Sequence, residues 1–195
     1  MNKRELVFTT LATALAASVS APARAGATSG YANLNGMKMY YEISGQGDPV
    51  VVLHGSFMNI PSMGALIPEL AKSHTVYAVE MQSHGRTNDI DRPITYPNMA
   101  DDVAAFMDAV KLPKAVILGY SMGAVLSLEM AIRHPDKVSK IVCISGAYDT
   151  DGIQQAYRDF IPSMTVESFK NMPFAADYKK LNPNPGGYEE HVRKT

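Results

Sequence analysis

The chain has no tryptophan, no run of basic residues, no internal repeat and no low-complexity block. Its formal net charge is −1, so electrostatics gives no reason to expect a nucleic acid or an anionic membrane as a partner. The sequence also lacks a glycine-rich phosphate loop and any metal-ligand spacing of His, Cys and carboxylate residues. We therefore expect no nucleic-acid partner, no metal and no cofactor, while the oligomeric state stays open.

Cysteine is almost absent as well. Cys143 is the only cysteine, which excludes an internal disulfide. It lies in the apolar run Ile141–Ile144, and free cysteines behave as small, usually buried hydrophobic residues. We expect Cys143 to be a buried structural residue.

Residues 1–25 differ from the rest of the chain. Lys3 and Arg4 precede an apolar stretch over residues 6–21, and Ala23-Arg24-Ala25 supplies the small residues of a cleavage site. This layout is typical of a secretory signal peptide that is removed after Ala25, and an N-terminal core helix is the alternative. The apolar stretch is too short and polar to favour a permanent membrane span. We expect an exported protein, periplasmic or secreted, with no membrane span after signal cleavage.

Apolar runs typical of strands alternate with amphipathic stretches typical of helices from residue 50 onward. Two earlier strands, at 31–35 and 37–44, flank the dipeptide Asn35-Gly36, which is a strong signal for a hairpin turn. Later strands are expected at 50–53, 75–79, 115–118 and 140–145, and helices at 63–72, 99–110 and 124–133. The alternation predicts an α/β fold with an N-terminal β-hairpin and a doubly wound, mainly parallel sheet.

The pattern changes after Gly146. Residues 147–195 contain short helical pieces, at 153–160 and 166–170, which are separated by prolines, and no further strand is visible. We therefore divide the chain into a signal peptide (1–25), an α/β core (26–146) and an incomplete helical cap or lid segment (147–195).

One pentapeptide carries the clearest chemical signal, Gly119-Tyr120-Ser121-Met122-Gly123. It has the pattern G-x-S-x-G and lies between the predicted strand at 115–118 and the predicted helix at 124–133. In this context the serine occupies a strained turn at the end of a sheet, and side chains at Gly119 and Gly123 would collide with neighbouring chain. Ser121 is therefore the candidate nucleophile, with a plain strand-to-helix turn as the alternative.

A second candidate segment, His54-Gly55-Ser56-Phe57, follows the predicted strand at 50–53. Ligands bind open α/β sheets at the carboxyl ends of the strands, so this segment and Ser121 are expected at one edge. The backbone N–H of Ser56 could pair with that of Met122 as an oxyanion hole, which stabilises charge on an attacked carbonyl oxygen. We interpret His54 as a brace for its turn rather than as a base.

Other titratable residues are interpreted as structural or solvated. His84 lies in a His-Gly turn, which is more often structural than catalytic. The charged residues of the following loop, Arg86, Asp89, Asp91 and Arg92, are interpreted as a solvated and locally paired group. His191 lies in a polar stretch that we expect to be exposed.

These segments together resemble the α/β-hydrolase superfamily, in particular its esterase-like bacterial branch. The matching pieces are Leu53-His54-Gly55, Ser83–Thr87, Asp101-Asp102, Gly119–Gly123 and Ala131–Pro135, and the resemblance covers about residues 31–195. It implies a serine hydrolase for a small carboxylic ester or related acyl substrate. Ser121 would be the nucleophile, and the amides of Ser56 and Met122 would form the oxyanion hole.

The resemblance also implies a triad in the chain order Ser, then Asp or Glu, then His. In the family the acid normally follows the strand after the one at 140–145, and the histidine follows the last strand. Neither strand is visible, so we expect a C-terminally truncated chain whose triad acid and histidine lie beyond its end, with one sheet edge exposed. Asp149 or Asp151 is an alternative acid, and His191 an alternative base. The alternative functions are a non-catalytic ligand-binding protein of this fold and an inactive truncated product.

Overall fold

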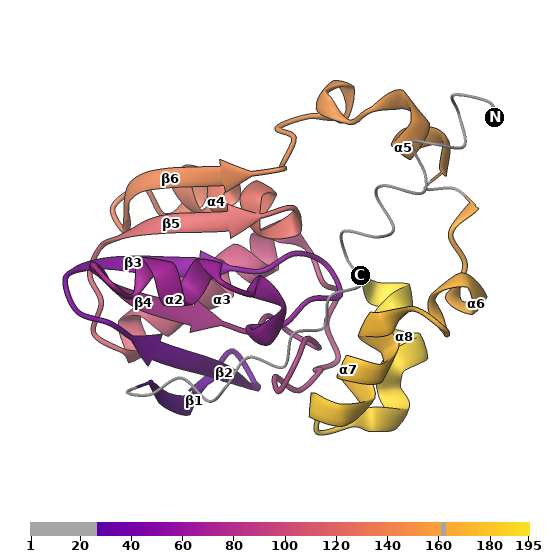
Figure 1. Cartoon of the computed structure of the whole chain (residues 1–195), viewed down its shortest axis with the longest axis horizontal. Helices are drawn as coiled ribbons and strands as arrows, with labels where there is room; N and C mark the ends of the chain where they lie inside the picture. Colours follow the sequence, from indigo (N-terminus) through magenta and orange to yellow (C-terminus); the bar gives the residue numbers. More distant parts are fainter. Residues whose placement is uncertain (1–26, 161–162) are drawn as a thin grey trace.

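The computed structural model describes residues 27–160 and 163–195, so the predicted signal peptide lies outside the described residues. Within this part of the chain, six strands form one sheet in the order β1-β2-β4-β3-β5-β6 (Figure 1). The first two pairings, β1 with β2 and β2 with β4, are antiparallel, and the other pairings are parallel. The strands are β1 (Thr28–Leu34), β2 (Met37–Ser44), β3 (Asp48–Leu53), β4 (His74–Val79), β5 (Ala115–Tyr120) and β6 (Val138–Ile144). The predicted mainly parallel sheet is confirmed.

Helices cover both faces of this sheet. The core helices are the short 3-10 helix η1 (Pro61–Met63), α2 (Leu66–Leu70), α3 (Tyr96–Ala109) and α4 (Met122–Arg133). Residues of α3 and α4 form one hydrophobic cluster with the sheet, and residues of η1 and α2 form a second cluster with it. The helix predicted at 63–72 is present but shorter, as α2, because Gly64 adopts a φ of 55° and separates η1 from α2.

Alternate residues of the central strand β3 belong to the two different clusters. Val51 and Leu53 pack with α3 and α4, whereas Val50 and Val52 pack with η1 and α2. Successive side chains of a strand point to opposite faces of the sheet, so a strand covered on both sides needs an uninterrupted apolar run. This is why the run at 50–53 predicts a buried parallel strand.

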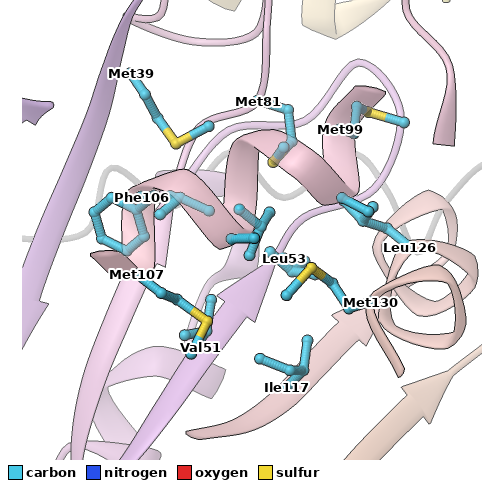
Figure 2. Packing of buried hydrophobic residues seen from close by; sticks show 14 of the residues in the cluster. Met39, Val51, Leu53, Met81, Met99, Phe106, Met107, Ile117, Leu126 and Met130 are labelled. Carbon is cyan, nitrogen blue, oxygen red and sulfur yellow. The ribbon is translucent and has the colours of Figure 1, made fainter. Parts of the chain in front are cut away.

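Methionines fill much of the larger cluster. Figure 2 shows Met39, Met81, Met99, Met107 and Met130 among the buried apolar side chains of this cluster, and none of these five side chains is more than 3% exposed. The unbranched, flexible thioether side chain fits irregular gaps between strands and helices. The cluster fixes α4, and therefore the turn from which α4 begins, against the sheet.

The turn between β1 and β2 has the predicted hairpin geometry. Asn35 and Gly36 both have positive φ angles, 47° and 84°, as a type I′ turn requires. The side-chain amide of Asn35 also donates to Asp102 Oδ1 at 2.8 Å, which ties the hairpin to α3.

Strand β6 lies at an edge of the sheet and, among the described residues, pairs with β5 alone. Ile141 and Val142 are 37% and 42% exposed, and Cys143 is exposed as well. The prediction that Cys143 is buried is therefore wrong, whereas the expected exposed sheet edge is present. An apolar run predicts a strand, but its burial depends on whether other elements cover that strand.

The described residues after β6 contain helices and no strand. These helices are η2 (Thr150–Gly152), α5 (Gln155–Phe160), α6 (Val166–Phe169), α7 (Pro173–Leu181), η4 (Pro185–Gly187) and α8 (Tyr188–Lys194). We call α6, α7 and α8 the cap helices; they lie beyond the carboxyl ends of the parallel strands (Figure 1). A small cluster that includes Phe169, Tyr178 and Tyr188 packs them together. No helix in residues 27–160 or 163–195 is both long and apolar enough to cross a bilayer.

Candidate active site

Ser121 lies in the turn between β5 and α4 with a strained backbone. Its φ is 53° and its ψ is −115°, a conformation that costs a non-glycine residue on the order of 1–3 kcal/mol. The amide of Ser121 donates to Ile144 O at 2.9 Å, and the amide of Ala124 donates to Ser121 O at 2.9 Å. The edge strand on one side and the first turn of α4 on the other therefore hold the strained serine in place.

The two glycines that flank Ser121 lie too close to neighbouring backbone to carry a side chain. A Cβ atom on Gly119 would lie 1.8 Å from Gly123 O, and one on Gly123 would lie 2.2 Å from Leu53 O. Such distances are far shorter than any real contact, so the strand, the turn and the helix meet only because both positions are glycine.

The turn after β3 lies against this serine. Leu53 of β3 pairs with Gly119 of β5, so the residues that follow the two strands leave the sheet side by side. A Cβ atom on Gly55 would lie 3.3 Å from Ser121 Cβ and 3.2 Å from Tyr120 Cδ1. The structure therefore brings the segment that contains Ser56 to the edge of the sheet where Ser121 lies.

The segment Gly55–Met58 is a tight turn with an unusual residue in its third position. The amide of Met58 donates to Gly55 O at 3.2 Å, and Phe57 has a φ of 62°. A positive φ at the third position is the pattern of a type II turn, where glycine is the usual residue. Phe57 is therefore a second strained residue beside Ser121.

Positive φ angles recur along this edge of the sheet. Each of the four parallel strands β3, β4, β5 and β6 is followed by one non-glycine residue with a positive φ, namely Phe57, Ser83, Ser121 and Ser145. Backbone strain gathers at functional sites, and ligands bind open α/β sheets at this edge. The clustering supports this edge as the functional one.

Two backbone amides are available beside Ser121. Met122 is the first residue of α4, and the amides of a helix's first turn have no acceptor within the helix. The partial positive charge of a helix N-terminus adds to the attraction for an anion at this point. The Ser56 amide belongs to the turn that packs on the elbow, so both candidate donors lie on segments adjacent to the serine.

His54 links the ends of two strands. Its Nδ1–H donates to Gly55 O at 2.8 Å, and its Nε2 accepts from the amide of Met81 at 3.1 Å. Burial lowers the pKa of His54 to about 4, so the imidazole is neutral at neutral pH. These contacts agree with the interpretation of His54 as a brace for its turn.

His84 and His191 form a buried stack with His54. The ring of His84 lies 5.0 Å from that of His54 and 4.5 Å from that of His191, between ring centroids. His84 Nδ1–H donates to Gln82 O at 2.8 Å, and burial lowers the pKa of His84 well below its usual value. The hydrogen bond and the ring contacts are consistent with a structural role for His84.

The prediction that His191 is exposed is wrong. Its side chain is 2% exposed and its ring stacks on Tyr178 at 4.9 Å. Tyr188 and His191 are three residues apart on α8, so they share the buried face of that helix, and this spacing was the available signal in the sequence. Burial lowers the pKa of His191 to about 4.

No histidine of the chain is hydrogen-bonded to Ser121, although all five lie within the described residues. Besides His54 and His84, the pairs are His74 with Ser73 Oγ at 2.8 Å, His134 with Asp101 at 2.8 Å, and His191 with Thr195 Oγ1 at 3.4 Å. The alternative assignment of His191 as the base is therefore not supported by its contacts.

The two alternative acids serve local structure instead. The Asp149 carboxylate accepts from the amides of Asp151 and Gly152, at 2.9 Å and 3.1 Å. Asp151 pairs with Arg158 at 3.2 Å, and its side chain is 94% exposed. Neither carboxylate is in the buried, histidine-facing position that a triad acid takes.

The loop after β4 is bound to buried carboxylates and is not simply solvated, which corrects the prediction for Arg86 and Arg92. Arg86 donates to Glu80 at 2.9 Å, and Arg92 donates to Asp102 at 2.5 Å; both carboxylates are 0% exposed. Burial raises the pKa of Glu80, and the charge of Arg86 opposes that rise. The pairs fix the loop that carries His84.

The cap helices are attached to the same loop by polar side chains that the sequence did not single out. The amide of Asn182, a buried residue, donates to Ser83 O, Gly85 O and Thr87 O at 3.4, 3.1 and 3.1 Å. Lys194 Nζ donates to Asp89 Oδ2 at 2.7 Å and to Ile90 O at 2.8 Å. The cap is thereby docked over the ends of β3 and β4.

The described residues contain no group of three His, Cys, Asp or Glu side chains that could hold a metal ion. A shallow groove of about 560 Å³ is lined by Tyr31, Lys38, Arg86 and Asn88 among others, and Ser121 is not part of its lining. The chemistry that the described site can support is therefore that of a serine hydroxyl beside backbone amides.

A strained serine at a strand-to-helix turn, with a second turn packed beside it, defines an α/β protein whose strand–turn–helix geometry is that of the motif called a nucleophile elbow. The sequence pattern of the alpha/beta hydrolase fold family matches residues 48–177, and the chain belongs to that family.

Known relatives agree with this assignment. Esterase YbfF of Escherichia coli (strain K12) is 32% identical over 96 residues, which are 49% of this chain and 37% of the relative. A protein of Wickerhamomyces anomalus named "Probable alcohol acetyltransferase" is 35% identical over 120 residues, which are 60% of this chain and 35% of the relative. The chain thus spans little more than a third of the length of these two relatives.

A solved structure supports the fold. The enol-lactonase from Burkholderia xenovorans LB400 superposes with a TM-score of 0.63 over 84% of this chain and 72% of that chain, at 20% sequence identity. At this level of identity the likeness concerns the fold, and the site must be argued from its own residues.

Proposed function

We propose that the chain carries the nucleophile half of a serine hydrolase site for small carboxylic esters. Ser121 attacks the ester carbonyl carbon, and the amides of Ser56 and Met122 stabilise the oxyanion of the tetrahedral intermediate. The intermediate releases the alcohol and becomes an acyl-serine, which water then hydrolyses to the free acid and Ser121. The observation that carries the proposal is the strained φ of Ser121 between two glycines that admit no side chain. The esterase among the relatives supports the ester as substrate.

A serine hydroxyl needs a base, and the contacts of the described residues supply none. Each of the five histidines is hydrogen-bonded elsewhere through at least one ring nitrogen, and Asp149 and Asp151 are exposed. We therefore propose that the triad acid and histidine belong to residues outside this chain. The gene tests this: an open frame beyond the Thr195 codon with an acid after one further strand and a histidine after a later one supports the proposal, and a stop codon there contradicts it.

The nucleophile is tested by covalent labelling of the full-length gene product with a fluorophosphonate. We expect the label on Ser121, turnover of p-nitrophenyl acetate, and loss of both in Ser121→Ala. Ser145→Ala is the matched control, because Ser145 also follows a parallel strand with a positive φ. Turnover by Ser121→Ala at the native rate would show that the nucleophile is another residue.

The oxyanion donor is tested by removing a single N–H. Ser56 occupies the second position of the type II turn, where proline fits well, so Ser56→Pro deletes the donor without changing the turn. We expect kcat to fall roughly 100-fold, as for other single oxyanion donors. Ser56→Ala keeps the amide and is the matched comparison; an equal loss in both variants would assign the effect to the side chain.

A non-catalytic ligand-binding protein is the second candidate, and the lack of a hydrogen bond between Ser121 and any of the five histidines favours it for the described residues taken alone. Such a protein binds a small apolar ester and resists the fluorophosphonate at Ser121.

Acyl transfer to an alcohol is distinguished from hydrolysis by adding an alcohol to the assay, since a transferase then forms a new ester in place of the free acid.

We also propose that the protein is exported, on the basis of the signal-like layout of residues 1–25. Mass spectrometry of the protein isolated from the cell envelope or the medium should give a mature N-terminus at Gly26. A retained Met1 in the soluble cell fraction would contradict export.

A further inference from the structure

Phe57 connects the candidate oxyanion turn with the cap helices. Its backbone occupies the third position of the Gly55–Met58 turn, next to Ser56. Its ring lies among cap side chains, with centroid distances of 4.7 Å to Phe169, 5.6 Å to Phe174 and 5.4 Å to His191. One residue therefore belongs both to the site and to the aromatic cluster of the cap.

The backbone of Phe57 is not in the conformation that a phenylalanine prefers. A φ of 62° is unfavourable for a bulky residue, and the type I turn, with a negative φ at this position, is the commoner alternative. The two turn types differ by a rotation of the peptide group between Ser56 and Phe57. A conformation of this kind persists only when surrounding contacts impose it, and the ring contacts with the cap are the ones that the structure provides.

We propose that Phe57 is a positioning residue through which the docked cap holds the oxyanion turn in its working geometry. The proposal rests on the proposed function, because the turn that is positioned carries the Ser56 amide. When the cap leaves Phe57, the turn relaxes to a negative φ and the Ser56–Phe57 peptide rotates, which exchanges the positions of the Phe57 N–H and the Ser56 carbonyl oxygen next to that amide. The site is then complete only while the cap is docked.

The first test separates backbone conformation from packing at position 57. Phe57→Ala removes the ring and keeps the penalty for positive φ, whereas Phe57→Gly removes the ring and the penalty together. We expect kcat for p-nitrophenyl acetate to be roughly fivefold higher in Phe57→Gly than in Phe57→Ala, with similar KM values, a ratio equivalent to about 1 kcal/mol. Equal kcat values in the two variants would overturn the proposal.

The second test acts from the cap. Phe169→Leu keeps the apolar volume but loses the ring that packs on Phe57, and we expect it to lower kcat roughly threefold to fivefold in the native background. In the Phe57→Gly background the same change should have no effect on kcat. Phe160→Leu, at a half-exposed position of α5, is the matched control. Equal effects of Phe169→Leu in both backgrounds would show that the cap does not act through Phe57.

A readout without catalysis separates this proposal from the proposed function. In a type II turn the Hα of the second residue lies next to the amide proton of the third, and the peptide rotation to type I moves these two protons apart. The nuclear Overhauser effect between Ser56 Hα and the amide proton of residue 57 therefore reports the turn type. We expect Phe57→Ala and Phe169→Leu to weaken this effect, and Phe57→Gly to leave it near the native intensity. If Ser121 resists the fluorophosphonate while this pattern appears, the proposed function fails and the coupling stands. An unchanged effect in all three variants would overturn the coupling.

Discussion

The core and the cap are held by different kinds of contact. In the core, large apolar side chains such as Val51, Phe106 and Leu126 are fully buried between the sheet and its helices. The cap helices reach the core through stacked aromatic rings, buried His191, and the polar side chains Asn182 and Lys194. Apolar burial is insensitive to pH, whereas contacts through histidine and ion pairs are not. The core is therefore expected to keep its packing as the pH changes, whereas the attachment of the cap depends on pH.

The largest loss in the free energy of unfolding is expected at the ion pair of Arg92 and Asp102, a charged contact at the edge of the apolar core. Arg92→Met leaves a fully buried carboxylate without its cation, and we expect a loss of about 3–5 kcal/mol in the free energy of unfolding. Urea denaturation of Arg92→Met against Arg133→Met measures it. Arg133 pairs with Asp101 on the surface, so its loss should be below about 1 kcal/mol, and equal losses would refute the distinction.

Acidification should loosen the cap before it disrupts the core. Burial lowers the pKa of His191 and that of His54 to about 4, so below pH about 6.5 the unfolded chain binds protons that the folded protein does not. Stability is full above pH about 6.5 and falls between there and pH about 4, by about 2 kcal/mol per histidine at pH 5.

The measurement is hydrogen exchange of the amides of α8 and β3 at pH 7 and pH 5, after correction for intrinsic rates. His84 and Asp89 also face this stack, and the carboxylate of Asp89 opposes the lowering of the His191 pKa. His191→Phe should make the pH dependence of α8 shallower. A cap equally protected at both pH values would contradict this reading of the histidine stack.

A smaller loss of cap-docking free energy is expected at Asn182, whose side-chain amide donates hydrogen bonds to three backbone carbonyls. Asn182→Leu keeps the volume and leaves Ser83 O, Gly85 O and Thr87 O without this donor, which should weaken cap docking by about 1–3 kcal/mol. Exchange of amides in α7 should accelerate while those of β5 keep the native rate. Acceleration in both elements would mean that cap and core unfold as one unit.

The smallest effect is expected at Lys194. Its ion pair with Asp89 is partly exposed, so Lys194→Gln should cost about 0.5 kcal/mol of cap docking, measured by the same exchange experiment. The difference from the native protein should shrink further in high salt, because salt screens partly exposed charges. A loss as large as that of Asn182→Leu would show that the ion pair, and not the amide, fixes the cap.

The sequence predicted the core well, because its signals are local. Continuous apolar runs identified β3 and β5, the Asn35-Gly36 dipeptide identified the hairpin, and the glycine spacing identified the elbow at Ser121. Each of these signals lies within a few residues and follows from backbone geometry alone.

The missed features depend on neighbours that are distant in the sequence. Cys143 is exposed because no described element covers the outer edge of β6, and His191 is buried because the loop after β4 lies beneath α8. The partners of Arg86 and Arg92 are carboxylates only six and ten residues away, Glu80 and Asp102, but a local pattern of charges does not reveal that both carboxylates are buried. Helix α7 was not among the helices predicted from the sequence, although its start at Pro173 could have been recognised, since proline is favoured in the first turn of a helix.

Oxidation of the buried methionines records how often the core of this protein has transiently opened. Peroxide converts accessible thioethers to sulfoxides, but Met39, Met81, Met107 and Met130 are 0% exposed and react only in molecules whose core has opened. Met172, between α6 and α7, is 40% exposed and reacts directly. Because a polar sulfoxide fits poorly between the sheet and α3, each oxidised core methionine is expected to destabilise the closed core, so the effects of transient openings accumulate until the sulfoxides are reduced.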